Sequence, residues 1–254
     1  MKKILVTGSF GYVGRHLVRQ LSNQGYGVIS LDRKVRKEMT LFKHEVPVEM
    51  DVRDPAVVAV LKDPELVGLC HLAASIYLGE SLEIPVEYYD NNVYGIIALL
   101  KAVKQVRPML PFVFASSAAT YGDPKVEDLP LIEDKSPATP QNPYGRSKKM
   151  GEEILLDAFE AGVVQPICLR SFNIASFGEA PVNQELTPNL RLIIPLLLHV
   201  ASEKRNSPTP AEIEGKVDRE RLLDISGRRR IQQMALAVRF GLTDYPTPSG
   251  GCCF

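Results

Sequence analysis

Short apolar runs alternate with segments of helical spacing along residues 3–169. The apolar runs cover residues 3–7, 28–31, 46–52, 68–74, 112–114 and 166–169. Between them, apolar residues recur three or four positions apart over residues 13–21, 55–61, 86–106 and 143–159. Such runs are typical of strands buried on both faces of a parallel sheet, where each strand needs a crossover before the next. The alternation predicts an α/β fold: a doubly wound parallel sheet with helices on both faces.

The alternation ends near Lys204. Residues 205–215 contain two prolines and a glycine among few apolar groups, which predicts a linker. Helical spacing returns over residues 227–240, and the last ten residues are too rich in proline and glycine for regular structure. We therefore expect a first domain of residues 1–204 and an atypical tail of residues 205–254.

Composition narrows the classes of function. Lys plus Arg and Asp plus Glu are 30 each among 254 residues, so a net charge of zero argues against an electrostatic grip on nucleic acid or membrane surfaces. No apolar run approaches the ~20 residues that span a bilayer, and the first one is too short for a signal peptide. The four cysteines form neither a disulfide framework nor a spaced metal-ligand set. We expect a cytoplasmic protein without a membrane segment or a metal.

A glycine-rich turn follows the first strand and opens the first helix: Gly8, Phe10, Gly11, Tyr12, Val13 and Gly14 belong to it. Glycines in this context let the backbone approach a pyrophosphate, which the helix N-terminus attracts. Asp32 ends the next strand, where a carboxylate accepts hydrogen bonds from an adenosine ribose and repels the extra phosphate of NADP. The pattern predicts an NAD site, although Arg33 and Lys34 keep NADP open. The alternative is a plain glycine turn beside a solvated acid.

Tyr144 and Lys148 stand four residues apart in the helix predicted from residue 143. They share one helix face, and a neighbouring ammonium stabilises a phenolate that would otherwise form only near pH 10. Ser117 follows the fifth strand, where its hydroxyl could hold a substrate hydroxyl. Behind a nucleotide-binding turn, these three residues predict proton transfer; alone, a Tyr–Lys pair is more often a surface feature.

Together these segments resemble the extended short-chain dehydrogenase/reductase superfamily, and within it the UDP-glucose 4-epimerases. The resemblance covers about residues 2–204 and rests on the glycine turn and on residues 50–54, 79–93, 116–123, 139–148 and 169–173. It implies a Rossmann-like fold, NAD as the cofactor, a UDP-sugar as the substrate and a homodimer through the helix around residues 86–106. It also implies that the C-terminal substrate domain is truncated or replaced here.

The resemblance assigns roles by position. Ser117, Tyr144 and Lys148 would be catalytic. Besides the glycine turn, Asp32, Tyr144 and Lys148, the residues that would contact the cofactor are Asp51, Val52, Leu72, Ala73, Ala74, Asn91, Ser116 and Phe172. Those that would contact the substrate are Ser117, Ala118, Tyr144 and Asn173. From the residues alone, Asp51 reads as a strand-end cap and Asn91 as a polar helix residue facing water.

The departures from the family leave three functions open. Ala118 and Ala119 stand where sugar dehydratases carry an Asp–Glu pair, which favours NAD-dependent 4-epimerisation of a UDP-hexose through a transient 4-keto sugar. A related sugar-nucleotide reductase or dehydrogenase is the second reading. The third is an NAD-binding module without turnover, because the arginines that clamp UDP in the family have no counterpart after Lys204. Residues 218–253 instead resemble part of a tRNA-thiolating, ATP-dependent sulfurtransferase; a fusion, a frameshifted or misassembled reading frame, and an unrelated extension are the three explanations. We expect NAD binding with weak epimerisation.

Overall fold

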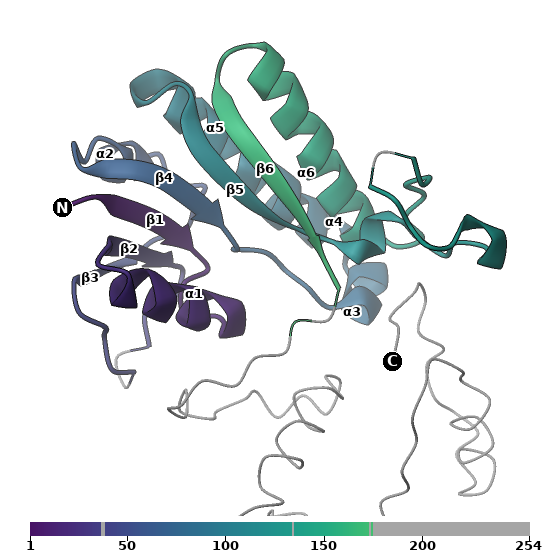
Figure 1. The fold of residues 1–254 in the computed structure, drawn as a ribbon, viewed down its shortest axis with the longest axis horizontal. Coiled ribbons are helices and arrows are strands. Elements are labelled where there is room, and N and C mark those ends of the chain that lie inside the picture. The colour runs from purple at the N-terminus through teal and green to yellow at the C-terminus, as the bar shows by residue number, and fades with distance from the viewer. Residues whose placement is uncertain (37–38, 134, 173, 175–254) are drawn as a thin grey trace, which may run out of the picture. The chain divides into compact units, whose positions relative to one another are not determined.

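Six parallel strands form one sheet in the computed structural model, which describes residues 1–36, 39–133, 135–172 and 174 (Figure 1). The strands lie in the spatial order β3-β2-β1-β4-β5-β6. Their bounds are β1 Lys3–Thr7, β2 Gly27–Asp32, β3 Glu45–Glu49, β4 Leu66–His71, β5 Leu110–Ser117 and β6 Val164–Ser171. The expectations for residues 205–254 and for Asn173 lie outside the described residues.

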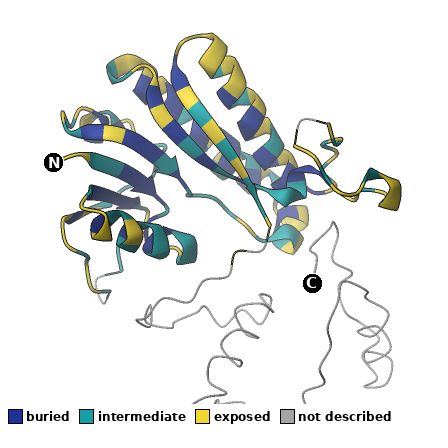
Figure 2. Cartoon of the chain, viewed as in Figure 1, coloured by how far each residue is buried: buried dark blue, intermediate teal, exposed yellow. Residues whose placement is uncertain are grey.

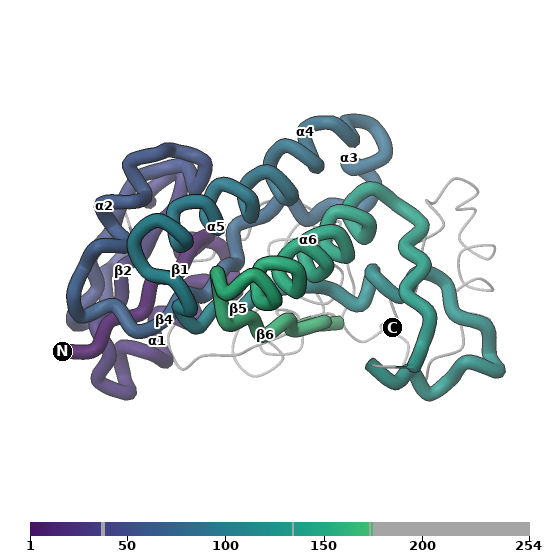
Figure 3. The backbone as a smooth tube through the Cα atoms, turned by 90° about the horizontal axis from the view of Figure 1, so that it is seen from above, coloured from purple at the N-terminus to yellow at the C-terminus, as the bar shows by residue number. Residues whose placement is uncertain are grey.

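Helices cover both faces of this sheet, so the predicted doubly wound architecture is confirmed. Helix α1 (Tyr12–Asn23) packs on one face, where Val18 joins Val6 and Val28 in a small apolar cluster. Helices α2 (Val57–Leu61), α5 (Gly95–Val106) and α6 (Pro143–Glu160) bury the larger cluster on the other face. Figure 3 shows α5 and α6 running alongside each other there, and Figure 2 shows the buried residues of the strands between the layers.

The predicted helix over residues 86–106 is interrupted. Helix α4 (Pro85–Tyr89) passes into a π-helical turn, η1 (Asp90–Tyr94), before α5 begins. A short helix, α3 (Leu78–Glu83), precedes them and had no sequence signal. A π turn inserts one extra residue into the helix, and such turns are frequent at functional sites.

Several element ends also differ from the expected ones. Strand β4 stops at His71, so residues 72–74 form a loop rather than the end of a strand. Helix α2 starts at Val57 instead of residue 55, because Val57 and Val58 donate to the carbonyls of Asp54 and Pro55, three residues back, as in a turn rather than an α-helix. Strands β5 and β6 are longer at both ends than their apolar runs, since ladder pairing continues from Leu110 to Ser117.

The sheet reverses its winding direction between β1 and β4, which are neighbours in space but not in sequence. In open α/β sheets, ligands bind outside the carboxyl ends of the strands at this point. The predicted site residues that the structure describes come from these carboxyl ends and from the helices that follow them. Among the described residues, no helix combines the length and the apolar character needed to cross a membrane.

Candidate active site

The glycine turn closes tightly between β1 and α1. Gly8 has φ +67°, and a Cβ atom there would lie 2.7 Å from the backbone nitrogen of Ala73. A Cβ atom on Gly14 would overlap the carbonyl oxygen of Gly8. Gly11 precedes α1 in an extended conformation and, as a glycine, offers no side-chain cap to the start of the helix. The turn therefore forms a cradle with a positive helix end, which suits a pyrophosphate.

Asp32 lies at the rim of this cradle. Its Oδ2 atom accepts the backbone N–H of Phe10 at 3.0 Å, and its Oδ1 atom accepts that of Lys34 at 3.3 Å. Each carboxylate oxygen can accept a further hydrogen bond. The arrangement fits a diol such as ribose, and it fixes the acid against the glycine turn. Together, the glycine turn and Asp32 therefore fit a dinucleotide.

Beneath the turn, Arg15 of α1 forms a buried ion pair with Glu45 of β3, at 2.6 Å. The Arg15 guanidinium lies over the Phe10 ring, 5.0 Å from its centroid, and over the Phe42 ring at 4.6 Å. This cluster holds Phe10, and hence its N–H toward Asp32, in place. The sequence analysis did not predict this ion pair, because residues 15 and 45 are far apart in the chain and no spacing pattern relates them.

The loop after β4 is anchored from below by His71. The His71 ring shares a hydrogen bond with the Thr7 hydroxyl at 2.7 Å, and that hydroxyl accepts the N–H of Ala73 at 3.4 Å. Burial, and then the charge of Lys148, lowers the pKa of His71 to about 3, so the ring stays neutral. Leu72 and Ala73 are thereby pressed against Gly8, as expected for residues that line the cleft, and Ala74 follows in the same loop.

Asn92, rather than Asn91, ties the site's segments together. Asn92 is buried in the π turn, accepts the N–H of Ser75 at 2.8 Å, and donates to the hydroxyl of Ser147 on α6 at 3.0 Å. The predicted residue, Asn91, donates to Asn92 and to the Ser75 hydroxyl. An Asn–Asn pair within an apolar helix was the available signal, but periodicity could not say which member faces inward across a π turn.

Asp51 and Val52 follow β3 at the same edge of the sheet. The Asp51 carboxylate accepts three hydrogen bonds from Arg53, whose guanidinium also pairs with Asp90. The side-chain hydrogen bond from Arg53 is the main cause that lowers the pKa of Asp51. Val52 is buried in the larger apolar cluster. The structure thus places both residues just after β3 and gives the Asp51 carboxylate a partner of its own.

The end of β5 packs directly on the first turn of α6. Ser117 caps a short 3-10 helix, η2 (Ala118–Thr120), by accepting the N–H of Ala119. A Cβ atom on Gly145 would lie 2.6 Å from the carbonyl oxygen of Ala119, so only glycine allows this approach. Asn142 caps α6 by accepting the N–H of Gly145, and Pro143 occupies its first turn. The predicted residues Ser117, Ala118 and Tyr144 are thus brought to one corner.

Tyr144 and Lys148 share the inner face of α6. The Lys148 Nζ atom donates to the carbonyl oxygen of Ala115 at 2.7 Å and lies 5.9 Å from the centroid of the Tyr144 ring. Lys148 is 4% exposed and Tyr144 is 9% exposed. Burial lowers the pKa of Lys148 to about 8, against an opposing effect of Glu152. The pair can therefore hold and exchange a proton near neutral pH.

Ser116 faces away from Ser117, as neighbours on a strand do. Its hydroxyl donates to Glu152, one turn beyond Lys148, and Glu152 is paired with Arg170 of β6. The Ser116 hydroxyl, which we expected to contact the cofactor, therefore donates its hydrogen bond to a carboxylate on the α6 side of β5. Phe172, just after β6, is 56% exposed.

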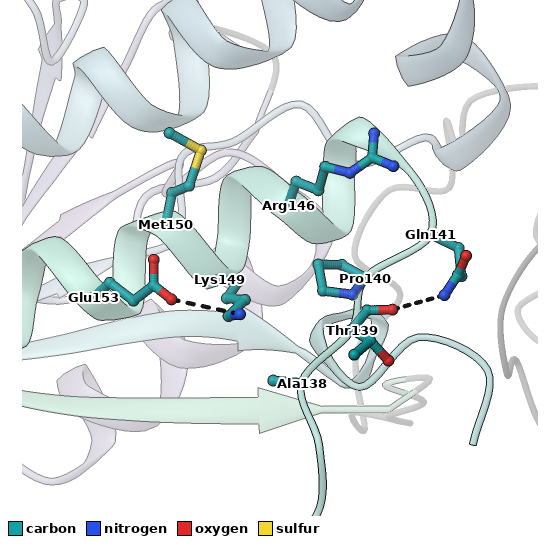
Figure 4. Close-up of a pocket in the computed structure, with 8 residues that line it drawn as sticks. All are labelled: Ala138, Thr139, Pro140, Gln141, Arg146, Lys149, Met150 and Glu153. Carbon is teal, nitrogen blue, oxygen red and sulfur yellow. Dashed lines mark hydrogen bonds and ion pairs between the residues drawn. The ribbon is translucent and has the colours of Figure 1, made fainter. Parts of the chain in front are cut away.

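Elsewhere, a shallow hollow of about 440 Å³ lies on the outer side of α6, beside the loop before it (Figure 4). It is lined by Ala138, Thr139, Pro140, Gln141, Arg146, Lys149, Met150 and Glu153. These helix positions lie opposite Tyr144 and Lys148, so the hollow is separate from the corner described above. The part of the chain that the structure describes contains no cluster of three metal-ligating His, Cys, Asp or Glu side chains.

Comparison with known proteins finds a matching family model and individual relatives of the same family. The family model described as "NAD dependent epimerase/dehydratase family" matches residues 4–221. A UDP-glucose 4-epimerase of Lactobacillus helveticus is 38% identical over 199 residues, which cover 75% of this chain and 58% of that protein. One of Azospirillum brasilense is 34% identical over 252 residues, which cover 98% of this chain and 63% of that protein.

Solved structures agree. A UDP-glucose 4-epimerase from Bifidobacterium longum in complex with NAD+ and UDP has a TM-score of 0.62 at 35% identity, over 68% of this chain and 53% of that chain. The Brucella ovis enzyme in complex with NAD has a TM-score of 0.62 at 36% identity, over 68% and 52%. The chain spans about 60% of the length of the two curated relatives named above. The match over residues 4–221 shows that the chain belongs to the NAD-dependent epimerase/dehydratase family.

Proposed function

We propose that this chain carries the NAD-binding and proton-transfer half of a UDP-hexose 4-epimerase. The observation that carries the proposal is the buried Tyr144–Lys148 pair at the carboxyl edge of a sheet whose first turn is built for a dinucleotide. Relatives at 34–38% identity are UDP-glucose 4-epimerases, and solved neighbours bind NAD and UDP. This function would belong to galactose metabolism.

The cofactor would lie along the strand ends. The turn from Gly8 to Gly14 would hold the pyrophosphate, and Asp32 would accept the hydroxyls of the adenosine ribose. Residues 51–52 would flank the adenine, while Leu72–Ala74 would line the middle of the cleft. Asn91, Ser116 and Phe172 remain proposed contacts, and Asn92 joins them through its hold on Ser75. Bound NAD would supply the hydride acceptor and donor that epimerisation requires.

The chain's own residues would manage the proton and the position of the sugar. Tyr144 would take the proton from the 4-hydroxyl and return it after the 4-keto sugar has rotated. The Lys148 ammonium, 5.9 Å from the ring centroid, would stabilise the tyrosine's phenolate during the transfer. Ser117 would orient the reacting hydroxyl, with Ala118 and Asn173 beside the sugar.

Epimerisation is favoured over dehydration by the residues that follow Ser117. Ala118 and Ala119 form the 3-10 turn against α6, and neither carries an acid or a base. Elimination of water needs a second acid–base group at the sugar. The choice of epimerisation over dehydration therefore rests on the apolar side chains of this turn together with the Tyr–Lys pair.

Stoichiometric protein mixed with NAD and UDP-galactose tests the proposal. The expected product is UDP-glucose without net NADH. Accumulating free NADH would favour a dehydrogenase instead. Bound NAD without UDP-glucose, even at long times, would favour a binding module without turnover and would contradict the epimerase.

The oligomeric state and the compartment are further parts of the proposal. A homodimer through residues 86–106 is supported by apolar groups that this segment exposes, including Val86 at 73% and Tyr94 at 45%. Light scattering after size exclusion tests it, with Val86→Asp expected to give the monomer. We also expect the protein to act in the cytoplasm.

A further inference from the structure

A buried carboxylate stands one helical turn beyond Lys148 and joins three elements. Tyr144, Lys148 and Glu152 follow one another at intervals of four along α6, so they share its inner face. Glu152 is 6% exposed and accepts the hydroxyl hydrogen of Ser116 on β5. From β6, Arg170 donates to both of its oxygens, through Nε at 3.0 and 3.1 Å and through Nη2 at 2.7 Å.

Strand β5 is attached to α6 at consecutive residues. The carbonyl of Ala115 receives Lys148, the hydroxyl of Ser116 donates to Glu152, and the next residue is Ser117. Two adjacent attachments fix both the height and the rotation of this strand end against the helix. The position of Ser117 relative to Tyr144 therefore depends on Glu152, although Glu152 itself lies behind the pair.

The guanidinium of Arg170 extends the same cluster outward. Its carbon atom lies 4.8 Å from the centroid of the Tyr121 ring, and its Nη1 atom donates to the carbonyl of Glu133. The hydrogen bonds that Arg170 donates to Glu152 are the main cause that raises the pKa of Arg170, so the guanidinium stays charged. A buried pair of this kind is strongly destabilised when one partner is removed, so variants must keep the hydrogen bonds.

We propose that Glu152 is a positioning residue for the Tyr144–Lys148 pair: it fixes the carboxyl end of β5 on α6 and places a carboxylate one helical turn from Lys148. The proposal rests on the proposed function, because only that function gives Lys148 a part in proton transfer. Glu152 touches neither a sugar nor a dinucleotide in this role.

Other titratable groups near Lys148 contribute less charge. On the elements packed against α6, the titratable side chains that are not exposed are Glu80, Tyr88, Tyr89, Tyr121, Cys168 and Arg170. Glu83 of α3 is exposed, and His71 of β4 feels the charge of Lys148. His71 is neutral, burial raises the pKa of Tyr88, and burial raises that of Cys168 to about 11. Glu80 is engaged by the Tyr88 hydroxyl at 2.6 Å. The carboxylates and ammonium groups of α4, η1 and α5 are exposed. Glu152 with its partner Arg170 is therefore the dominant buried charge.

The test measures the titration midpoint of Lys148 itself, by NMR of isotope-labelled lysine side chains in the NAD-free chain. The Lys148→Met spectrum identifies the signal. Glu152→Gln keeps the shape and a hydrogen-bonding oxygen but removes the charge, so the midpoint should fall from about 8 by roughly half a unit or more. The matched control is Glu153→Gln: Glu153 pairs with Lys149 on the outer side of α6 and should leave the midpoint unchanged (Figure 4).

A second variant, Arg170→Gln, should shift the Lys148 midpoint in the opposite direction. Arg170→Gln retains a donor for Glu152 but removes the positive charge, so the Lys148 midpoint should rise. It also keeps the experiment decisive if Glu152→Gln does not fold. An unchanged midpoint in whichever variant folds, or an equal shift in Glu153→Gln, would overturn the proposal. Because this readout needs no sugar turnover, a failure of the epimerase assignment would leave these midpoints as they are and so be recognised separately.

Discussion

The Nζ atom of Lys148 lies 2.7 Å from the carbonyl oxygen of Ala115, which fixes the lysine between helix α6 and strand β5. Phe114 lies beneath the same nitrogen, with its ring centroid 4.9 Å away. The charge is thus held by one carbonyl and two aromatic rings, in a place that excludes water. Because burial lowers the pKa of Lys148 to about 8, the protonation of Lys148 changes with pH near neutrality. The Tyr144 ring, whose centroid lies 5.9 Å from Nζ, is close enough to be affected by this charge.

Lys148 should give the protein a distinct pH dependence of stability. Burial lowers its pKa to about 8 in the folded chain, from an ordinary value of 10.5. Between pH 8 and pH 10.5, Lys148 keeps its proton in the unfolded chain but loses it in the folded chain. The free energy of unfolding therefore rises with pH over this range. The gain should approach roughly 3 kcal/mol by pH 10.5.

Denaturant unfolding of the wild type and of Lys148→Met, from pH 7 to pH 10.5, measures it. The difference between the two proteins isolates Lys148 from the cysteines and tyrosines that titrate in the same range. A difference that stays flat with pH would mean that the lysine is not desolvated in solution.

Gly14→Ala should abolish or greatly weaken NAD binding. The added Cβ atom would overlap the carbonyl oxygen of Gly8, so the cradle must open. We expect at least about a tenfold loss of affinity, or about 1.4 kcal/mol, by calorimetry. Gly79→Ala is the control, since a Cβ atom there meets nothing within 4 Å. Equal affinity in wild type and Gly14→Ala would place the dinucleotide elsewhere.

Asp32→Asn should relax the choice of cofactor. The amide oxygen can still accept the N–H of Phe10, but the charge that repels a ribose phosphate is gone. NADP affinity should rise by about tenfold or more, with a smaller change for NAD. Asp54→Asn, which alters an exposed acid at the start of α2, should change neither. Wild-type protein that binds NADP as tightly as NAD would refute the role of Asp32.

Tyr144→Phe should remove epimerisation and spare cofactor binding. The ring still packs under the site, but the proposed proton acceptor is lost, which typically costs between a hundredfold and about ten-thousandfold in rate. Rates of UDP-glucose formation and NAD affinity are measured on the same preparations. Tyr94→Phe, at an exposed position on η1, serves as the control. A variant that retains most of its rate would exclude Tyr144 as the base.

The sequence patterns that are local predicted their parts of the fold well. The glycine turn and the first strand at residues 3–7 follow from glycine spacing and an apolar run, and α6 begins at Pro143 behind the Asn142 cap. The parallel, doubly wound character of the sheet also follows from the alternation of strands and helices, whereas the order of its strands had to be read from the structure. Alternation along β5 could further have shown that Ser116 and Ser117 face opposite sides.

What the sequence could not predict depends on contacts between distant residues. A π turn shifts the helical phase by one residue, so helical periodicity gave no sign that Asn92 faces inward. The pairing of Glu152 with Arg170 joins a helix to the next strand. No spacing pattern in the sequence relates the two residues, because their charges meet only once α6 lies on the sheet.

The fate of the hydrogen on sugar carbon 4 tests the central claim most directly. Stoichiometric chain and NAD are incubated with UDP-galactose that carries deuterium at this carbon, and the products are analysed by mass spectrometry. Tyr144 moves only the proton of the 4-hydroxyl, and NAD returns the hydride to the carbon from which it came. The account therefore predicts that the UDP-glucose formed keeps the deuterium. Deuterium found in free NADH, its exchange with solvent, or the absence of labelled UDP-glucose would contradict the account.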